Sequence, residues 1–231
     1  MRMMKGFTLI ELMIAIALGL IVIAGAISFY VLTISGSTNT IKSAQLNYDL
    51  GVAMTLMAND IKRSGYWGGA ISGADSALNP FMAATERVKV LDSGQCVLYT
   101  YDASGDDSDS NGDDVETDEY YGFKLDSGTI RMRLTGATTA DCSDGSWASS
   151  EIIDGDLINI TALTFVPTYS CLNITNSAST IQATTSECTT AGDSIVEIRQ
   201  VTITLTGQLV GDSSVSETLS ETVMIRNNRI L

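Results

Sequence analysis

The chain begins with a short basic segment and continues in a long apolar run. The run extends from Phe7 to about Ile34, and Glu11 is its only charged residue. A helix of this length crosses the roughly 30 Å hydrocarbon core of a bilayer, and the run is too long for an ordinary cleaved signal peptide. Because positive residues stay on the cytoplasmic side, Arg2 and Lys5 place the N-terminus in the cytoplasm and the rest outside. The pattern therefore predicts a membrane-spanning helix.

A second helical pattern follows the apolar run. Its apolar positions recur at helical spacing and form one stripe: Leu46, Leu50, Ala53, Met57 and Ile61. Gly65 follows two basic residues and is typical of a helix end. Between the two patterns, the segment from Ser35 to Thr40 has low helix propensity, so we expect a break, a bend or a loosened turn there. We expect the stripe to pack on the chain's own sheet.

Beyond Gly65, short alternating runs are separated by Gly, Ser, Asp and Asn. The predicted strands are Val97–Tyr101, Tyr120–Leu125, Thr129–Leu134, Leu157–Val166, Glu197–Leu209 and Val215–Arg226. Asp126-Ser127-Gly128 predicts a hairpin turn. No long helical pattern lies between the strands, which favours an antiparallel sheet. The predicted fold class is α+β, with a long N-terminal helix packed at its C-terminal half on an antiparallel β-sheet domain.

Composition restricts the chemistry of the chain. The chain carries 13 Lys and Arg against 27 Asp and Glu, a formal net charge of -14. Such a surface repels phosphate backbones, so we expect no direct contact with nucleic acid. The chain has no histidine, which excludes a Ser-His-Asp triad, a Cys-His pair and a His-based zinc site. No other catalytic constellation stands out, and we expect that the protein is not an enzyme.

Four cysteines remain, namely Cys96, Cys142, Cys171 and Cys188. None forms a C-x-x-C pair, and an even count in an exported domain favours two disulfides. Three pairings are possible. We favour Cys96–Cys142 with Cys171–Cys188, because neighbours in the sequence close first. The alternative, four buried free thiols, would require a reducing compartment.

The start of the apolar run carries a family resemblance. Gly6-Phe7-Thr8-Leu9-Ile10-Glu11 resembles the class III signal shared by type IV prepilins and type II secretion pseudopilins. The resemblance implies that prepilin peptidase cleaves after Gly6 and that Phe7 becomes the N-methylated terminus. It also implies that Glu11 pairs with the terminal amine of a neighbouring subunit and sets the axial register. A buried carboxylate and a buried ammonium are each costly alone and offset one another when paired. Alternatively, Glu11 lies near the interface and reaches the headgroups.

Later segments resemble PilW-type minor pilins. The first is Met54–Gly68, where an acidic-Ile-basic stretch runs into Gly-Tyr, and the others are Gly128–Arg133, Val201–Gly207 and Thr222–Arg229. Ser28 stands where major pilins often carry a kinking proline, and this departure favours a minor pilin. The resemblance implies a minor pilin that helps to initiate or cap a type IV pilus, with downstream roles in adhesion, twitching motility or DNA uptake. A type II secretion pseudopilin and a calcium-dependent adhesin at the pilus tip remain alternatives, as does a membrane-tethered enzyme.

The resemblance also implies an organisation and a set of partners. Residues 1–6 would be the leader, 7–35 the transmembrane and filament-core helix, 36–65 its amphipathic second half, and 66–231 a periplasmic or extracellular globular domain. The partners would be other minor pilins, the major pilin, prepilin peptidase, the inner-membrane assembly platform and a tip adhesin. The protein would stay in the inner membrane until assembly and would then lie in the extracellular pilus, near its tip.

One acidic loop is a candidate metal site. Asp107, Asp109 and Asn111, followed by Gly112, match the first half of a calcium-binding loop, in which alternate oxygen ligands converge on one cation. Asp113 and Asp118 complete the candidate ligand set, although a calcium loop normally has a bidentate Glu at the last position. The alternative is a solvated acidic loop without a metal.

Overall fold

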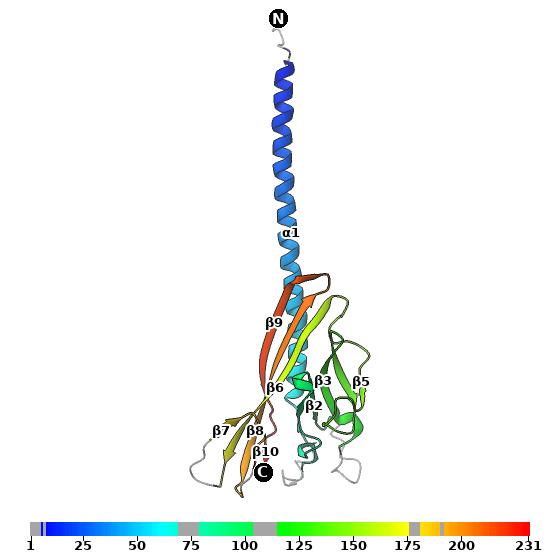
Figure 1. Cartoon of the computed structure of the whole chain (residues 1–231), viewed down its shortest axis with the longest axis vertical. Coiled ribbons are helices and arrows are strands. Elements are labelled where there is room, and N and C mark those ends of the chain that lie inside the picture. Colours follow the sequence, from blue (N-terminus) through cyan, green and yellow to red (C-terminus); the bar gives the residue numbers. More distant parts are fainter. Residues whose placement is uncertain (1–5, 7, 69–78, 104–114, 176–180, 190–191) are drawn as a thin grey trace. The chain divides into compact units, whose positions relative to one another are not determined.

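The computed structural model describes residues 6, 8–68, 79–103, 115–175, 181–189 and 192–231. The chain divides into two compact units, residues 1–45 and 46–231, and each is described by itself. Helix α1, Leu9–Ile61, contributes to both units (Figure 1). Of the described residues, α1 provides one segment long and apolar enough to cross a membrane, with a mean hydropathy of 2.7 in its most apolar window.

The predicted break between Ser35 and Thr40 is wrong, because α1 runs through this segment without interruption. The hydroxyl groups of Thr38 and Thr40 donate to the carbonyl oxygens of Ile34 and Gly36, at 2.9 and 3.0 Å. These i−4 bonds keep the polar side chains on the helix's own backbone. Low propensity is therefore outweighed by the cooperativity of a long helix.

Two antiparallel sheets make up most of the second unit. The first has the order β1-β2-β3-β4-β5, with bounds Lys89–Leu91, Cys96–Thr100, Tyr120–Asp126, Thr129–Thr135 and Ser146–Trp147. The second has the order β10-β8-β6-β7, with β9 also on β8, and bounds β6 Ile158–Asn173, β7 Ile181–Thr184, β8 Ile195–Leu209, β9 Asp212–Met224 and β10 Arg229–Ile230. The predicted α+β class and all six predicted strands are confirmed.

The main departure from the predicted strands is the length of β6. It continues past Pro167, which pairs with Val201 of β8, whereas pairing with β7 begins only at Tyr169. At Pro167, the side of β6 that faces away from β8 is not paired with any strand of the described residues. The missing N–H of proline therefore interrupts no hydrogen-bonded ladder there. The predicted hairpin turn is confirmed, with positive φ angles of 53° at Ser127 and 83° at Gly128.

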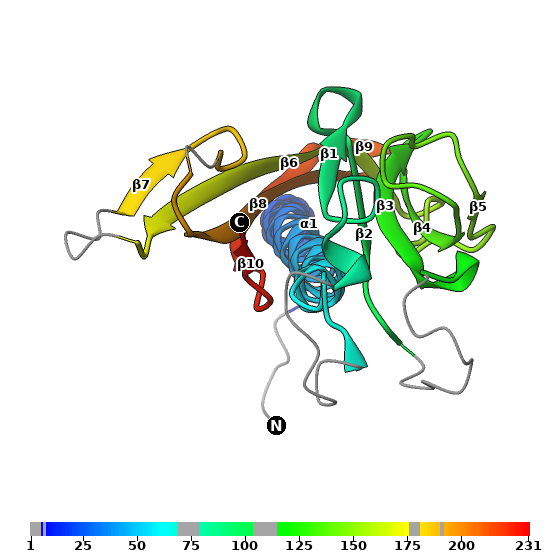
Figure 2. The same cartoon turned by 90° about the horizontal axis from the view of Figure 1, so that it is seen from below.

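The predicted stripe on α1 forms the centre of the core. All five of its residues are at most 1% exposed. They belong to one cluster with inward residues of the second sheet, including Leu163, Phe165, Ile203 and Leu205. Figure 2 shows β6 and β8 on one side of the end of α1 and β2 and β3 on the other. Apolar burial on both sides of the helix therefore holds the two sheets together.

Two disulfides join Cys96 to Cys142 and Cys171 to Cys188, the pairing favoured from the sequence. Their Cα–Cα distances are 6.6 and 5.7 Å. The first links β2 to the loop after β4, and the second links β6 to the segment after β7. Each bridge therefore fastens an irregular segment to a strand.

Candidate functional site

The start of α1 holds Glu11 in a defined position. Its Oε2 accepts hydrogen bonds from the backbone N–H and the hydroxyl of Thr8, at 3.1 and 3.0 Å, and the Glu11 N–H donates to the Thr8 hydroxyl at 3.3 Å. This reciprocal arrangement is a capping box, which satisfies helix N–H groups that lack an intrahelical acceptor. The carboxylate therefore caps its own helix.

Thr8 is a site residue that the sequence analysis did not single out. Its signal is the Thr-x-x-Glu spacing of a capping box just before an apolar run. Both hydrogen bonds that Thr8 donates go to Oε2 of Glu11. Among the described residues, no donor contacts the other oxygen, Oε1. The capping box therefore uses only one oxygen of the carboxylate.

The predicted cleavage site lies next to this cap. Gly6 is exposed, whereas Phe7 lies outside the described residues. Cleavage after Gly6 and methylation of Phe7 therefore stay predictions.

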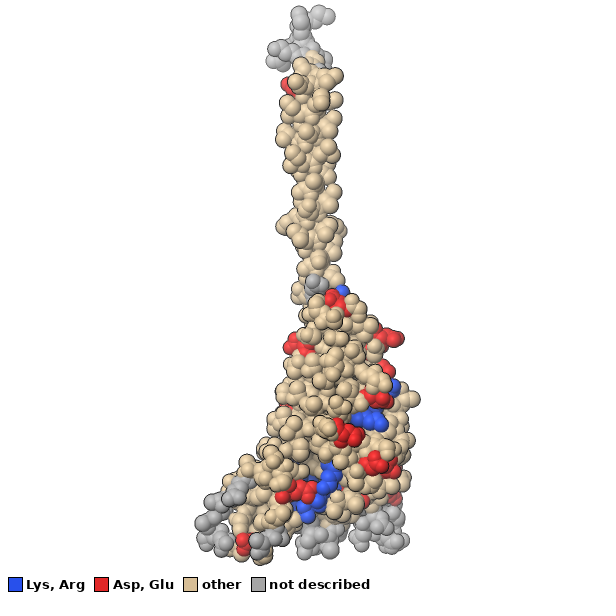
Figure 3. Space-filling model, in the orientation of Figure 1, with Lys and Arg blue, Asp and Glu red and all other residues tan. Residues whose placement is uncertain are grey.

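The first unit presents apolar side chains on every side of its helix. Large hydrophobic residues from Leu9 to Ile34 are between 47% and 78% exposed, and Figure 3 shows an almost uncharged surface along this helix. A helix that is apolar all round requires lipid or protein around it. A Cβ built on Gly19 or Gly25 meets nothing within 4 Å, so these positions leave room for another helix to approach closely.

A polar network around the last turn of α1 attaches the C-terminal end of the helix to β2. Asp60 accepts hydrogen bonds from the hydroxyls of Tyr99, at 2.6 Å, and Tyr101, at 2.8 Å. The guanidinium of Arg63 lies 4.1 Å from the centre of the Tyr101 ring, and the Gly65 N–H donates to the carbonyl of Thr100 at 2.8 Å. Burial, together with the Asp60 carboxylate, raises the pKa of both phenols, which remain donors. The acidic-Ile-basic stretch running into Gly-Tyr therefore attaches the helix to β2.

An apolar groove of about 860 Å³ runs along the end of α1. Exposed side chains of Tyr48, Val52 and Leu56 form one wall, and Phe123 and Met132 of β3 and β4 contribute to the other. The groove lies within the second unit. It is a surface on which apolar groups could bind.

The candidate calcium ligands fall largely outside the described residues. Asp107, Asp109, Asn111 and Asp113 lie there, and Asp118 is exposed in a short 3-10 turn, Thr117–Glu119. Calcium binding therefore stays a prediction.

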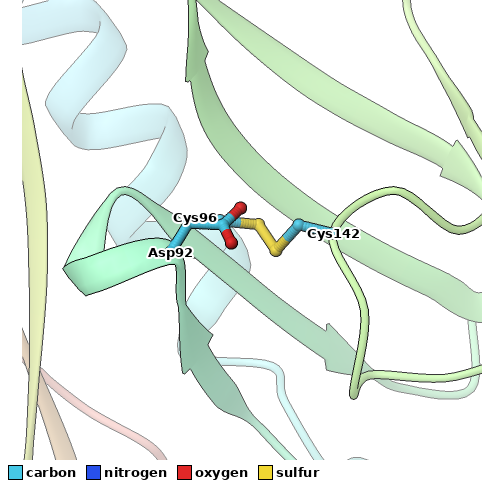
Figure 4. A group of neighbouring side chains, drawn as sticks. All are labelled: Asp92, Cys96 and Cys142. Carbon is cyan, nitrogen blue, oxygen red and sulfur yellow. A yellow bond between two sulfur atoms is a disulfide. The ribbon is translucent and has the colours of Figure 1, made fainter.

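Another cluster of possible ligands is formed by Asp92, Cys96 and Cys142 (Figure 4). The two sulfur atoms are joined in a disulfide and are not thiolates, which are the species that bind metals. This cluster therefore does not qualify as a metal site.

The carboxyl group of Glu119 should make stability depend on pH. Its side chain is nearly buried, and burial, reinforced by the carboxylates of Asp102 and Glu116, raises its pKa to about 7 despite a hydrogen bond from the Glu116 N–H. Because the pKa is higher in the folded state, this contribution to stability is present below the ordinary value of 4.5 and is lost as pH rises through 7. We compare how much the free energy of unfolding falls between pH 5 and pH 8 in the native chain and in the Glu119→Gln variant. The fall should be about 1 to 3 kcal/mol larger in the native chain. Denaturant unfolding measures this, and identical pH profiles would refute it.

Known families and proteins resemble this chain over much of its length. Residues 39–225 match the family model "Prepilin peptidase-dependent protein B", and residues 1–27 match the "Prokaryotic N-terminal methylation motif". Prepilin peptidase-dependent protein B of Escherichia coli (strain K12) is 25% identical over 147 residues, which cover 62% of this chain and 68% of that protein. A type IV-like pilin from Thermus thermophilus aligns in structure with a TM-score of 0.39 and 11% identity, covering 79% of this chain and 97% of the other.

The first family model covers most of the chain, and its match includes the end of α1, the whole first sheet and all of the second sheet except β10. The methylation motif covers the capped start of α1 and Glu11. This chain therefore belongs to the prepilin peptidase-dependent protein B family of type IV pilin-like proteins.

Proposed function

We propose that this protein is a minor pilin that helps to initiate or cap a type IV pilus. The observation that carries the proposal is the start of α1, where a prepilin motif leads into a capped Glu11 and then into an exposed apolar helix. Such a helix suits a membrane before assembly and a bundle of like helices afterwards. The role is structural rather than catalytic.

Glu11 supplies the specificity of assembly in this proposal. After cleavage at Gly6, the terminal ammonium of a neighbouring subunit approaches Oε1, while Thr8 still holds Oε2. The carboxylate and the ammonium are both removed from water. Each is therefore stabilised only when the two subunits are aligned along the filament axis so that the two groups meet. The helix cap therefore positions the carboxylate before the partner arrives.

The groove along α1 supports packing against other subunits. Tyr48, Val52 and Leu56 recur at intervals of four residues and extend the apolar character of the helix into the second unit. We propose that other minor pilins and the major pilin cover these exposed residues of the groove. We also propose that the complex lies at the pilus tip. The assembly platform in the inner membrane and a tip adhesin are further proposed partners.

The experiment that tests this function deletes the gene and counts pili per cell. Loss of piliation that is restored by the native gene, and not by a version in which a substitution of Gly6 blocks processing, supports the proposal. Normal piliation together with a defect in type II secretion would instead assign the protein to the pseudopilins, which share the same signal.

A further inference from the structure

We infer that the free edge of β9 binds an extended strand of another protein, one that carries basic residues. This inference does not depend on the proposed role in initiation, because it concerns a surface of the second unit alone. Figure 1 shows β9, in orange-red, at the outside of the second sheet. It pairs with β8 along one edge, from Gln200 to Leu209, and within the described residues no strand pairs with its other edge.

The length of β9 sets it apart from the other outer strands. β9 has 13 residues, whereas β1, β5, β7 and β10 have 3, 2, 4 and 2. Natural proteins commonly shorten edge strands, or place lysine or proline in them, to prevent unwanted pairing. β9 contains neither lysine nor proline, and the charges on its core-facing side, Glu217 and Glu221, repel acidic strands but not basic ones. A long edge of backbone donors and acceptors selects a ligand by shape, because only an extended segment can pair with it.

The side chains of β9 define the chemistry of that segment. Glu217 and Glu221 alternate with apolar residues on the core-facing side, and Glu221 lies 3.9 Å from the ammonium of Lys62. An added strand would place its own side chains directly beside these glutamates, where opposite charges are favourable and like charges are not. Lysine or arginine four residues apart would therefore fit the edge.

On the opposite face of β9, small or β-branched residues of the added strand would pack best. Thr218 and Thr222 exchange hydroxyl contacts with Thr206 and Thr202 of β8, both at 2.9 Å. Threonine, serine or valine continues such a hydroxyl ladder.

A second copy of this chain does not suit the edge. Two β9 strands would bring glutamates beside glutamates, and each chain has a net charge of -14. The same two glutamates that attract a basic strand thus discourage self-pairing.

Hydrogen exchange on the full chain in detergent micelles tests this inference. The probe is a synthetic peptide of about nine residues that alternates threonine with valine or lysine, with two lysines four positions apart. At millimolar concentration it should slow exchange of β9 amides by at least about fivefold. A matching peptide with glutamate for lysine, and one N-methylated at alternate residues, should give no protection.

A charge reversal on β9 provides the specific control. Glu217→Lys should weaken binding of the lysine peptide at least about tenfold and should improve binding of the glutamate peptide. Asp156→Lys makes the same charge change on an exposed loop and should alter neither. Circular dichroism checks that both variants are folded. The inference is overturned if the lysine peptide gives no protection, if the N-methylated or glutamate peptide protects equally, or if β9 is protected without peptide in a concentration-dependent manner.

Discussion

A Glu11→Gln subunit is expected to fold and reach the membrane but to enter pili at least about tenfold less often than the native subunit. The reason is the unpaired ammonium of its neighbour, since removal of one partner from a buried ion pair costs about 3 to 5 kcal/mol. Glutamine is the informative replacement because it can still accept both hydrogen bonds from Thr8 and so preserves the capping box. The ratio of subunit in sheared pili to subunit in membranes measures the effect.

The matched control removes the threonine hydroxyl of the cap and keeps the charge of Glu11. Thr8→Val should cost about 1 kcal/mol of local helix stability. It should reduce incorporation far less than Glu11→Gln, because the backbone N–H of residue 8 can still donate to Oε2 of Glu11. The pairing role of Glu11 is wrong if Glu11→Gln enters pili normally, or if Thr8→Val is as defective as Glu11→Gln.

Loss of the Cys96–Cys142 disulfide is expected to destabilise the second unit by about 4 kcal/mol, and loss of Cys171–Cys188 by about 3 kcal/mol. The difference follows from loop length, because the first bridge closes a separation of 46 residues and the second one of 17. Paired alanine variants, compared by denaturant unfolding of the full chain in detergent, measure both values.

The first bridge also lies in a small core of its own. Cys96, Cys142 and Leu98 form a cluster separate from the main one. The loop between β4 and β5, which contains Cys142, is also held by a hydrogen bond. The buried guanidinium of Arg133 donates to the carbonyl oxygen of Thr138 at 2.9 Å. The Cys96–Cys142 variant should therefore remain folded at low temperature. A larger loss of stability from the Cys171–Cys188 variant would contradict the loop-length argument.

Much of this fold can be predicted from periodicity alone. The stripe from Leu46 to Ile61 has a period that only a helix satisfies, and the six longer strands alternate over enough residues to be recognised. The four short strands could not be found, because two to four residues carry too little alternation. The segment Ser35–Thr40 was misjudged because propensity is a weak guide inside a long helix, where threonine hydroxyls can bond back to the preceding turn.

The candidate site was predictable in its composition but not in its contacts. An acidic residue within an apolar run is visible in any sequence, so Glu11 stood out. The contacts of Asp60 were not visible, because Tyr99 lies 39 residues further along the chain and only folding brings the two together. The Thr-x-x-Glu spacing of Thr8 and Glu11 is a local signal and was available.

The central claim is that the capped start of α1 becomes the mature, paired terminus of an assembled subunit. Mass spectrometry of the N-terminus, from cells with and without prepilin peptidase, tests this claim most directly. N-methylated Phe7 is expected when the peptidase is present, and intact Met1 is expected when it is absent. An intact Met1 in cells that contain the peptidase, or a terminus beyond Ser28, would contradict it.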